Sequence, residues 1–495
     1  MSAAQRSGRL PRLFERVRLV TIQPPGYAHS GAFAELVDGF RAAFAALGAQ
    51  VDAAVNQPLA GEGVNFVFGA HLIAPEYPLP QGSIIVNLEQ MRRGMHVQPH
   101  YVELLKRHAV LDYSARNVAR IIELTGNRHV HPCRIGYMPE LTRIEAAPVQ
   151  DIDVLFYGVL NERRKNILDG LAAAGIKVAV LPPGVYGAQR DAAIARAKIV
   201  LNVHFYEDKV HEIVRSSYLL ANRKIVVSEC ETDTEIDDDI REAVIAVPYA
   251  GIVETCVALL RDEARRAAIE RKGYEIFARR DQAALLAEVL PKFSLPFPRH
   301  LNLGSGKAYD AAKLNIDIDP KWKPDVLGNL VVPGGLKQVF FSRRFGLVRL
   351  EPGRFDDIST IDVLEHVPDL VALMTRCLEL LDVGGTMRIV VPYDLSWGAW
   401  QDPTHVRAFN ERSWLYYTDW HWYLGWNEAR FDVKEMGMKL SAVGEALRQR
   451  GTAGDELFRV PRAVDEMQVV LVKRLLSEAE RQQALAYQAG RRDAD

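Results

Sequence analysis

The chain of 495 residues is 48% hydrophobic and 25% charged, and its formal net charge is −2. This composition is typical of a globular protein, and the length exceeds one ordinary hydrophobic core, which predicts two to four domains. The near-neutral charge excludes a global attraction to nucleic acid, and because no basic run with interleaved aromatic residues is present, we expect no polynucleotide partner.

The amino-terminal residues have no long apolar core before a small-residue cleavage site, so the sequence predicts no export signal and no transmembrane segment. The four cysteines lie far apart without metal-binding spacing, which indicates packed, reduced thiols in a cytoplasmic protein. Peripheral association with a membrane-bound acceptor is compatible with these features.

Strands and helices alternate through the first half of the chain. Strand-like VRLVTI (17–22) precedes a glycine-bearing loop and an amphipathic helix over 32–48, and a second series begins at DIDVLFYG (151–158) after an aperiodic segment with two prolines. This βαβ order predicts two Rossmann-like α/β domains, at 1–140 and 151–290, with a ligand cleft between them.

Three blocks in this half are LDYSARNV (111–118), DVLFYGVLNERRKNIL (153–168) and KIVLNVHFYEDKVHEIVRSSYLLANRKIVVSE (198–229). They resemble the GT-B glycosyltransferases, in particular CgeB-like bacterial enzymes of cell-surface glycans. The resemblance covers about 17–290 and implies a nucleotide-sugar donor and a glycan or glycolipid acceptor.

The donor diphosphate becomes more negative as the glycosyl bond breaks, so cations and helix amino-termini aimed at it would stabilise the transition state. In the GT-B interpretation we expect these residues at the donor: Arg163, Lys165, Asn202, His204, Glu212, Arg215 and Ser217. A solvated helix face is the alternative for the Arg-Arg-Lys run. Ser217 stands near the place where many GT-B enzymes have an acidic ribose ligand, which favours a half that binds the sugar nucleotide without transferring it.

His29 follows the first strand, where inverting GT-B enzymes often carry a catalytic histidine. A base there would need a pKa near neutrality and reach to an acceptor hydroxyl. An exposed loop histidine without a catalytic role is the alternative.

Between the halves, EVLPKFSLPFPRH (288–300) contains three prolines and predicts an extended connector. The next stretch, LNLGSGKAYDAAKLNIDIDP (301–320), indicates a strand, a glycine turn and a second strand that ends in acidic residues. Gly304 and Gly306 allow a sharp turn close to a ligand, and Asp317 or Asp319 could accept hydrogen bonds from two ribose hydroxyls.

LNLGSG, IDVLEH (361–366) and LLDVGG (380–385), in this order, resemble the class I S-adenosylmethionine-dependent methyltransferases over about 299–475. The resemblance implies a third Rossmann-like domain and S-adenosylmethionine as cofactor. Residues expected at the cofactor are Leu303, Gly304, Ser305, Gly306, Asp317, Ile318, Asp362, Val363 and Leu364. Ala308 and Asn329 depart from the pattern, and the polar tail 476–495 has no expected chemistry.

The segment 394–426 holds six of the seven tryptophans, which suits a sugar acceptor site, although a hydrophobic lid is the alternative. Its Asp-Pro-Thr-His element resembles that of glycan-directed methyltransferases. We expect His405 as general base with Asp402 as its orienting partner, and His366 as the competing base. Asp402 and His405 could instead hold a cation, but no third ligand is identifiable, so no metal site is predicted.

Together the two resemblances imply a fusion of a glycosyltransferase with an O-methyltransferase that acts on a surface glycan or glycolipid. In the alternative, the amino-terminal half is a non-catalytic module that binds a glycan or a nucleotide-sugar, and a scaffold without activity is a further alternative.

Overall fold

The structure, a computed structural model, describes residues 10–91, 97–205, 210–331 and 338–492. Parts of the expected domain 1–140 and of the block 198–229 lie outside these ranges. The chain divides into two compact units, Met1–Ser294 (unit 1) and Leu295–Asp495 (unit 2). The fold is α/β, with a Rossmann-like sheet in each half of unit 1 and a third in unit 2.

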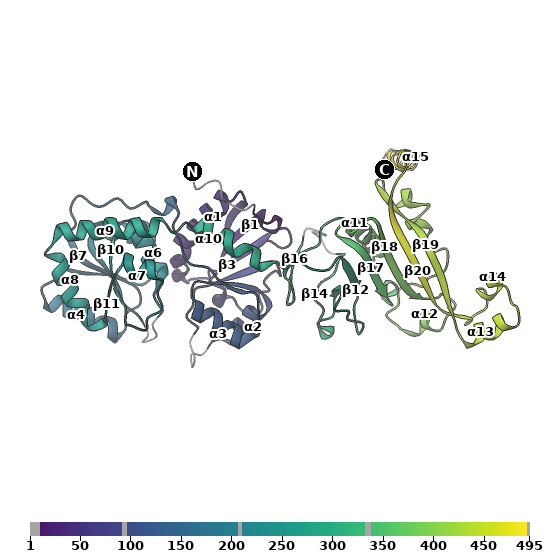
Figure 1. Cartoon of the computed structure of the whole chain (residues 1–495), viewed down its shortest axis with the longest axis horizontal. Helices are drawn as coiled ribbons and strands as arrows, with labels where there is room; N and C mark the ends of the chain where they lie inside the picture. Colours follow the sequence, from purple (N-terminus) through teal and green to yellow (C-terminus); the bar gives the residue numbers. More distant parts are fainter. Residues whose placement is uncertain (1–9, 92–96, 206–209, 332–337, 493–495) are drawn as a thin grey trace. The chain divides into compact units, whose positions relative to one another are not determined.

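Unit 1 begins with a six-stranded parallel sheet in the order β2-β1-β3-β4-β5-β6 (Figure 1). Its central strands are buried along their whole length, as expected for a parallel sheet covered on both faces. The elements are β1 (Arg16–Thr21), α1 (Ala34–Ala46), β2 (Gln50–Val55), β3 (Val64–Phe68), β4 (Ser83–Asn87), α2 (Pro99–Arg107), β5 (Ala109–Asp112), α3 (Ala115–Thr125) and β6 (Val130–Pro132).

The second sheet of unit 1 has five parallel strands in the order β11-β10-β9-β7-β8. The strands are β7 (Ile152–Tyr157), β8 (Val178–Leu181), β9 (Ala197–Asn202), β10 (Ile225–Glu229) and β11 (Ile245–Val247). The helices are α4 (Glu162–Ala173), α5 (Ala188–Arg196), α6 (Ile213–Ala221), α7 (Asp238–Ala243), α8 (Ile252–Leu260), α9 (Glu263–Ala278) and α10 (Gln282–Val289). The last helix, α10, returns to pack against α1 of the first half (Figure 1).

Unit 2 contains a seven-stranded sheet in the order β14-β13-β12-β17-β18-β20-β19, in which β20 runs antiparallel to both its neighbours. The strands are β12 (His300–Leu303), β13 (Leu314–Asp317), β14 (Val326–Leu327), β17 (Phe355–Ile361), β18 (Leu381–Pro392), β19 (Ala429–Leu440) and β20 (Val464–Leu475), with a separate hairpin of β15 (Val339–Ser342) and β16 (Gly346–Arg349). The helices are α11 (Leu370–Leu380), α12 (Gly398–Gln401), α13 (Ala442–Gln449), α14 (Gly454–Leu457) and α15 (Glu478–Arg492).

One segment differs from expectation. The amino-terminal part of the expected connector forms the 3-10 helix η7 (Leu290–Phe293), because Leu290 and Phe293 are fully buried in unit 1. The polar tail forms α15, which packs against the 3-10 helix η12 (His421–Leu424). Tyr487 contacts Trp422 there, with ring centroids 4.8 Å apart.

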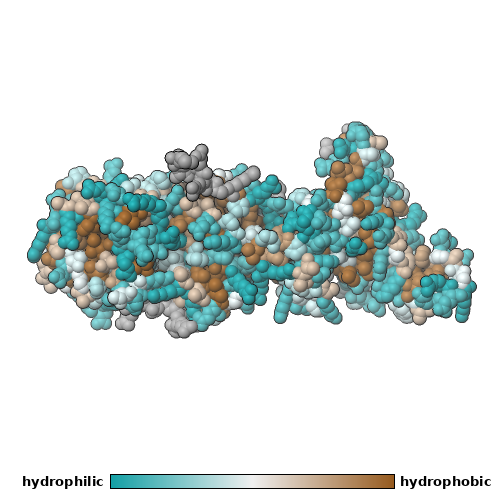
Figure 2. All heavy atoms as spheres, in the orientation of Figure 1, coloured by the Kyte–Doolittle hydropathy of each residue, from teal (hydrophilic) through white to brown (hydrophobic). Residues whose placement is uncertain are grey.

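The surface on the visible face is mostly hydrophilic, with hydrophobic residues showing beside β19 and β20, where Val433, Met436 and Leu475 are exposed (Figure 2). All four cysteines are buried free thiols. Within the described residues, no helix combines the length and the apolarity needed to cross a bilayer.

Candidate functional site

A cavity of about 350 Å³ lies between the two halves of unit 1. His29 and Glu35, which follow β1, line one side, and Tyr157 and Gly158, at the end of β7, line another. Both β1 and β7 lie where the strand order reverses, since β1 pairs with β2 and β3, and β7 pairs with β8 and β9. Open α/β sheets bind ligands outside the carboxyl ends of their strands at such positions. The two places at which the strand order reverses, one in each half of unit 1, therefore lie at the same cavity.

An ion cluster of Arg164, Glu212 and Arg215 borders this cavity. Arg164 Nη2 donates to Glu212 Oε1 at 2.7 Å, and Arg215 Nη2 lies 3.1 Å from Glu212 Oε2. Burial lowers the pKa of Arg164 to about 10. Burial would raise the pKa of Glu212, but Arg215 and Arg164 hold it below its ordinary value. Two cations and one anion give this cluster a net positive charge, whereas Glu35, Glu89 and Arg190 add two negative charges and one positive charge to the cavity lining.

The backbone conformation and the close approach of Arg215 favour glycine at position 158. Its φ is +131°, and a Cβ there would lie 2.8 Å from Arg215 Nη2. The missing side chain therefore lets the Arg215 guanidinium lie against the end of β7, where its Nη1 also donates to Asn202 Oδ1 at 3.1 Å.

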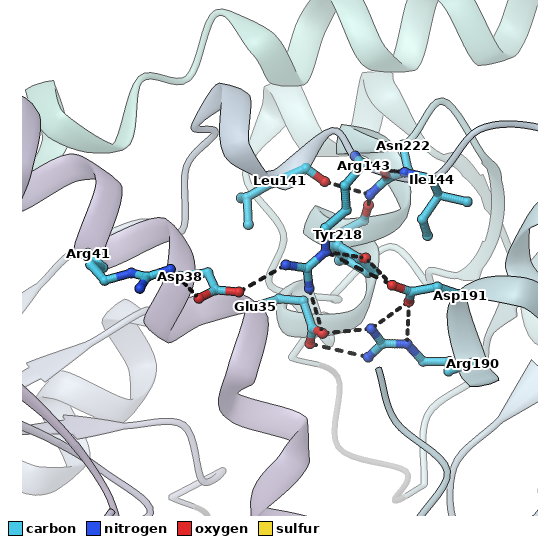
Figure 3. A network of polar contacts seen from close by, with 10 residues as sticks. All are labelled: Glu35, Asp38, Arg41, Leu141, Arg143, Ile144, Arg190, Asp191, Tyr218 and Asn222. Carbon is cyan, nitrogen blue, oxygen red and sulfur yellow. Dashed lines mark hydrogen bonds and ion pairs between the residues drawn. The ribbon is translucent and has the colours of Figure 1, made fainter. Parts of the chain in front are cut away.

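A second polar network joins α1 to α5 and α6 across unit 1 (Figure 3). Arg190 Nη2 donates to Glu35 Oε1 at 2.6 Å, and Arg143 Nη2 donates to the same oxygen at 3.2 Å. Tyr218 Oη donates to Asp191 Oδ2 at 2.8 Å. Because Glu35, Arg190 and Tyr218 also line the cavity, the network fixes its two sides relative to each other.

His29 is half-buried in the 3-10 helix η3 (Ala28–Phe33), and its Nδ1 lies 3.2 Å from Tyr186 Oη. Both side chains line the cavity. Sequence reasoning missed Tyr186, Arg190 and Glu35, because nothing in their local pattern separates them from ordinary loop and helix residues.

Of the seven expected donor-binding residues, all described by the structure, Glu212 and Arg215 line the cavity and the other five lie elsewhere. Arg163 pairs with Glu229 and lies 4.0 Å over the Tyr249 ring, whereas Lys165 is exposed on α4. Successive residues of a helix point about 100° apart, so only one member of the Arg-Arg-Lys run can point inward, and that member is Arg164.

The remaining three expected donor residues are buried. Asn202 contacts Ser228, and His204 follows the carboxyl end of β9 by two residues. Ser217 donates to Val214 O at 3.2 Å and so satisfies its hydroxyl within α6.

In unit 2 the glycine turn follows β12, beside Asp317 at the end of β13. Asp317 Oδ2 accepts from Gly306 N at 2.7 Å, and its Oδ1 accepts from Asp319 N at 2.9 Å. Gly304 has φ +67°, and a Cβ on it would overlap Val363. The turn, Asp317 and the loop after β17 therefore meet at one edge of the sheet.

The other expected cofactor residues take different places at this edge. Leu303, Ser305 and Leu364 are buried, and the Ser305 hydroxyl has no hydrogen-bond partner among the residues described. Ile318 is 73% exposed. Asp362 takes a φ of +52°, and burial raises its pKa above the ordinary value.

Glu365 and His366 in the 3-10 helix η10 (Leu364–His366) lie beside His405. One potential ligand atom from each of the three lies within 4.8 Å of the others, and the two imidazole centroids are 4.6 Å apart. Val406 N donates to Glu365 O at 2.8 Å, and Arg407 Nη2 donates to Val367 O at 2.7 Å. These bonds fix the loop that carries His405 onto η10.

The expected pairing of Asp402 with His405 differs from the structure. Asp402 Oδ1 accepts from Thr404 Oγ1 at 2.7 Å, and that hydroxyl lies 2.9 Å from His366 Nδ1. His405 Nδ1 lies instead 3.0 Å from Ala399 O. Asp402 therefore orients His366, through Thr404, because a short turn directs its carboxylate back toward its own loop.

Sequence reasoning missed Glu365 as the third ligand-type side chain of this cluster. Glu365 is 1% exposed, and neither carboxylate oxygen has a hydrogen-bond partner in the described part of the chain. Burial raises the pKa of Glu365 to about 7. The position of Glu365 directly before His366 in the sequence could have indicated that the two side chains lie close together.

The tryptophan-rich segment divides between core and surface. Trp414 and Trp426 are buried in the core of unit 2. Trp397 and Trp400 are 61% and 70% exposed, and Arg462 lies 3.7 Å over the Trp397 ring. Only part of this segment is therefore available to an acceptor.

No protein-family profile matches the chain. The uncharacterized protein L140 of Acanthamoeba polyphaga mimivirus is 28% identical over 189 residues, which cover 36% of this chain and 59% of L140. The mimivirus uncharacterized protein L138 is 32% identical over 114 residues, 23% of this chain and 13% of L138. The chain thus spans less than two thirds of these relatives, and their viral source gives no support to a bacterial origin.

Two solved structures illustrate the fold likeness. A SAM dependent methyltransferase from Archaeoglobus fulgidus is 17% identical with a TM-score of 0.23, and the match covers 38% of this chain and 91% of that one. Anabaena Alr3699/HepE in complex with UDP and glucose is 12% identical with a TM-score of 0.38, covering 56% and 98%.

Proposed function

We propose that the chain is a transferase with an S-adenosylmethionine-dependent methyltransferase site in unit 2 and a nucleotide-sugar site in unit 1. Its product would be a methylated glycan or glycolipid, most simply an O-methylated sugar. The observation that carries the proposal is the meeting of the glycine turn with Asp317 at the carboxyl ends of β12 and β13. We assign the domains as 1–140, 151–290 and 299–475.

Asp317 is suited to hold an adenosyl ribose. An ionised carboxylate has about four lone-pair sites. Two accept from the backbone N–H groups of Gly306 and Asp319, which fix the side chain beside the turn. The remaining two can accept hydrogen bonds from adjacent ribose hydroxyls.

A base is available close to this edge for methyl transfer to oxygen. A hydroxyl that attacks a sulfonium methyl group must lose its proton, and His405 or His366 can accept it. His366 lies in η10, which follows β17 and Val363, and the backbone bond from Val406 N to Glu365 O joins the loop that carries His405 to η10.

The cavity in unit 1 supports a nucleotide-sugar site. Arg215, with Arg164 behind it, offers positive charge to a diphosphate, and the volume of about 350 Å³ suits a small ligand. A binding module without transfer is the second candidate. It is favoured because Glu212 already neutralises one of the two arginines and because Ser217 lies within α6.

The methyltransferase site is tested by calorimetric titration of the full chain with S-adenosylmethionine. We expect saturable binding that Asp317→Ala weakens at least tenfold, because the ribose then loses its acceptors. Asp319→Ala is the matched control, since that carboxylate pairs with Lys321 at 3.1 Å. Absence of binding, or equal binding by the Asp317 variant, contradicts the assignment.

The unit 1 site is tested by titration with UDP, GDP and dTDP. At least one should bind, and Arg215→Ala should weaken that binding at least tenfold because a charged contact to the diphosphate is lost. Lys165→Ala, a cation exposed on α4, should leave it unchanged. Release of the nucleotide from the matching nucleotide-sugar separates a transferase from a binding module, and failure of all three to bind rejects both.

A further inference from the structure

Glu365, His366 and His405 form a cluster of ligand-type side chains that the methyl-transfer argument does not fully use. One nitrogen or oxygen from each lies within 4.8 Å of the others. Two of them come from η10, and the loop of the third is hydrogen-bonded to η10 through Val406. The cluster is thus held together by the backbone.

The hydrogen bonds around the cluster select which ring nitrogen of each imidazole carries a hydrogen in its neutral form. A carbonyl oxygen only accepts, so His405 Nδ1 donates its hydrogen to Ala399 O at 3.0 Å. Thr404 has one hydroxyl hydrogen, which it donates to Asp402 at 2.7 Å, so Thr404 Oγ1 accepts from His366 Nδ1 at 2.9 Å. In its neutral form each ring therefore has its lone pair on Nε2. This is how second-shell groups prepare histidines for metal ions.

Glu365 gives an independent indication of a cation. Its carboxylate is buried at 1% exposure, and within the described ranges neither oxygen has a hydrogen-bond partner. A buried carboxylate without donors is unfavourable. The two adjacent imidazoles in their neutral form do not donate to it, because each Nδ1 hydrogen already goes to Thr404 or Ala399.

We propose that Glu365, His366 and His405 bind a divalent transition-metal ion, with Zn²⁺ as the best match. Two imidazoles and one carboxylate suit zinc or iron rather than magnesium or calcium, and three protein ligands leave a coordination position open. Tetrahedral ligands about 2.1 Å from an ion lie roughly 3.4 Å apart, so the side chains close by small rotations from the 4.8 Å limit observed.

The site does not depend on the proposed cofactor. If unit 2 does methylate a hydroxyl, which rests on the proposed function, an oxygen bound at the open position would lose its proton to solvent more readily, and the ion would take the place of the imidazoles as the activating group. In this proposal Glu365, His366 and His405 take the place of the Asp402 and His405 pair considered from the sequence. Asp402 does not bind the ion but accepts a hydrogen bond from Thr404, which contacts His366.

The test uses the full chain after removal of metal by a chelator. We expect one equivalent of Zn²⁺ to bind in calorimetric titration and one equivalent of Co²⁺ to give visible ligand-field absorption. His405→Ala and Glu365→Gln should each weaken Zn²⁺ binding at least tenfold, because each removes a ligand.

Thr404→Val provides a variant that leaves the core intact, because Thr404 is exposed. It interrupts the hydrogen bond to His366 and should weaken Zn²⁺ binding roughly tenfold. His300→Ala, an exposed histidine at the start of β12, should bind normally. Lack of saturable Zn²⁺ or Co²⁺ binding, or unchanged binding by His405→Ala, overturns the proposal. Titration with S-adenosylmethionine is a separate measurement, so failure of one site is distinguishable from failure of the other.

Discussion

At the scale of single residues, burial changes the pKa of titratable side chains, as His108 illustrates. His108, directly after α2, is 5% exposed, and its Nδ1 has no hydrogen-bond partner among the described residues. Burial, and secondly the neighbouring Arg107, lower the pKa of His108 to about 4. The imidazole is therefore neutral in the folded protein at pH values where an unfolded chain would protonate it.

This predicts a pH-dependent loss of stability. The folded pKa of about 4 is below the ordinary value of 6.5, so the contribution is complete above pH 6.5 and is lost as the pH falls toward 4. At pH 5 the loss is about 2 kcal/mol. The calorimetric melting temperature of the wild type should fall relative to that of His108→Leu between pH 7 and pH 5. A constant difference between the two proteins would rule out this role.

At the scale of single elements, the glycine turn after β12 depends on two properties of Gly304. Its φ is +67°, which L side chains rarely adopt, and Val363 occupies the space of its missing Cβ. Gly353 has the same φ of +67° but open space around it. The two glycines therefore separate backbone strain from side-chain overlap.

Gly353→Ala should cost about 1 to 2 kcal/mol, the strain of a positive φ. Gly304→Ala should cost more and should also weaken S-adenosylmethionine binding, because the loop carrying Val363 must shift. The double variant Gly304→Ala with Val363→Ala should recover part of the loss. Unfolding by urea and calorimetric titration measure these effects, and equal stability of the two single variants would disprove the overlap.

The rotation of a single helix also explains why few of the expected cations lie at the cavity. Arg163, Arg164 and Lys165 are adjacent in sequence, but α4 turns each to a different side. Only Arg164 reaches Glu212, whereas Arg163 pairs with Glu229. The sequence predicts a cationic start to α4, and the rotation of the helix determines which of the three cations points toward Glu212.

For the whole molecule, three hydrophobic clusters of the described residues each lie within one unit. One cluster runs from Leu301 to Leu471 in unit 2, and the clusters around Val67 and Val154 belong to the two sheets of unit 1. Separate cores allow separate sites in one chain. If both proposed activities are present, a covalent link raises the concentration of the first product near the second site without a shared pocket.

The sequence was sufficient for the α/β class and for one Rossmann-like sheet in each of three regions, because alternating strand and helix periods are local properties of the chain. Gly304, Gly306 and Asp317 were also predictable as neighbours, since a tight turn and the next strand end must meet at one sheet edge. The prolines at 288–300 predicted a junction near the division of the two units but not the burial of Leu290 and Phe293.

Only the tertiary structure decided which side chains meet across the chain. It joined Glu35 of α1 to Arg190 of α5, and Glu365 of η10 to His405 of a distant loop. It also divided the tryptophans between core and surface. Such contacts depend on the packing of separate elements and on the rotation of each helix, and neither quantity is encoded in the local spacing of residue types.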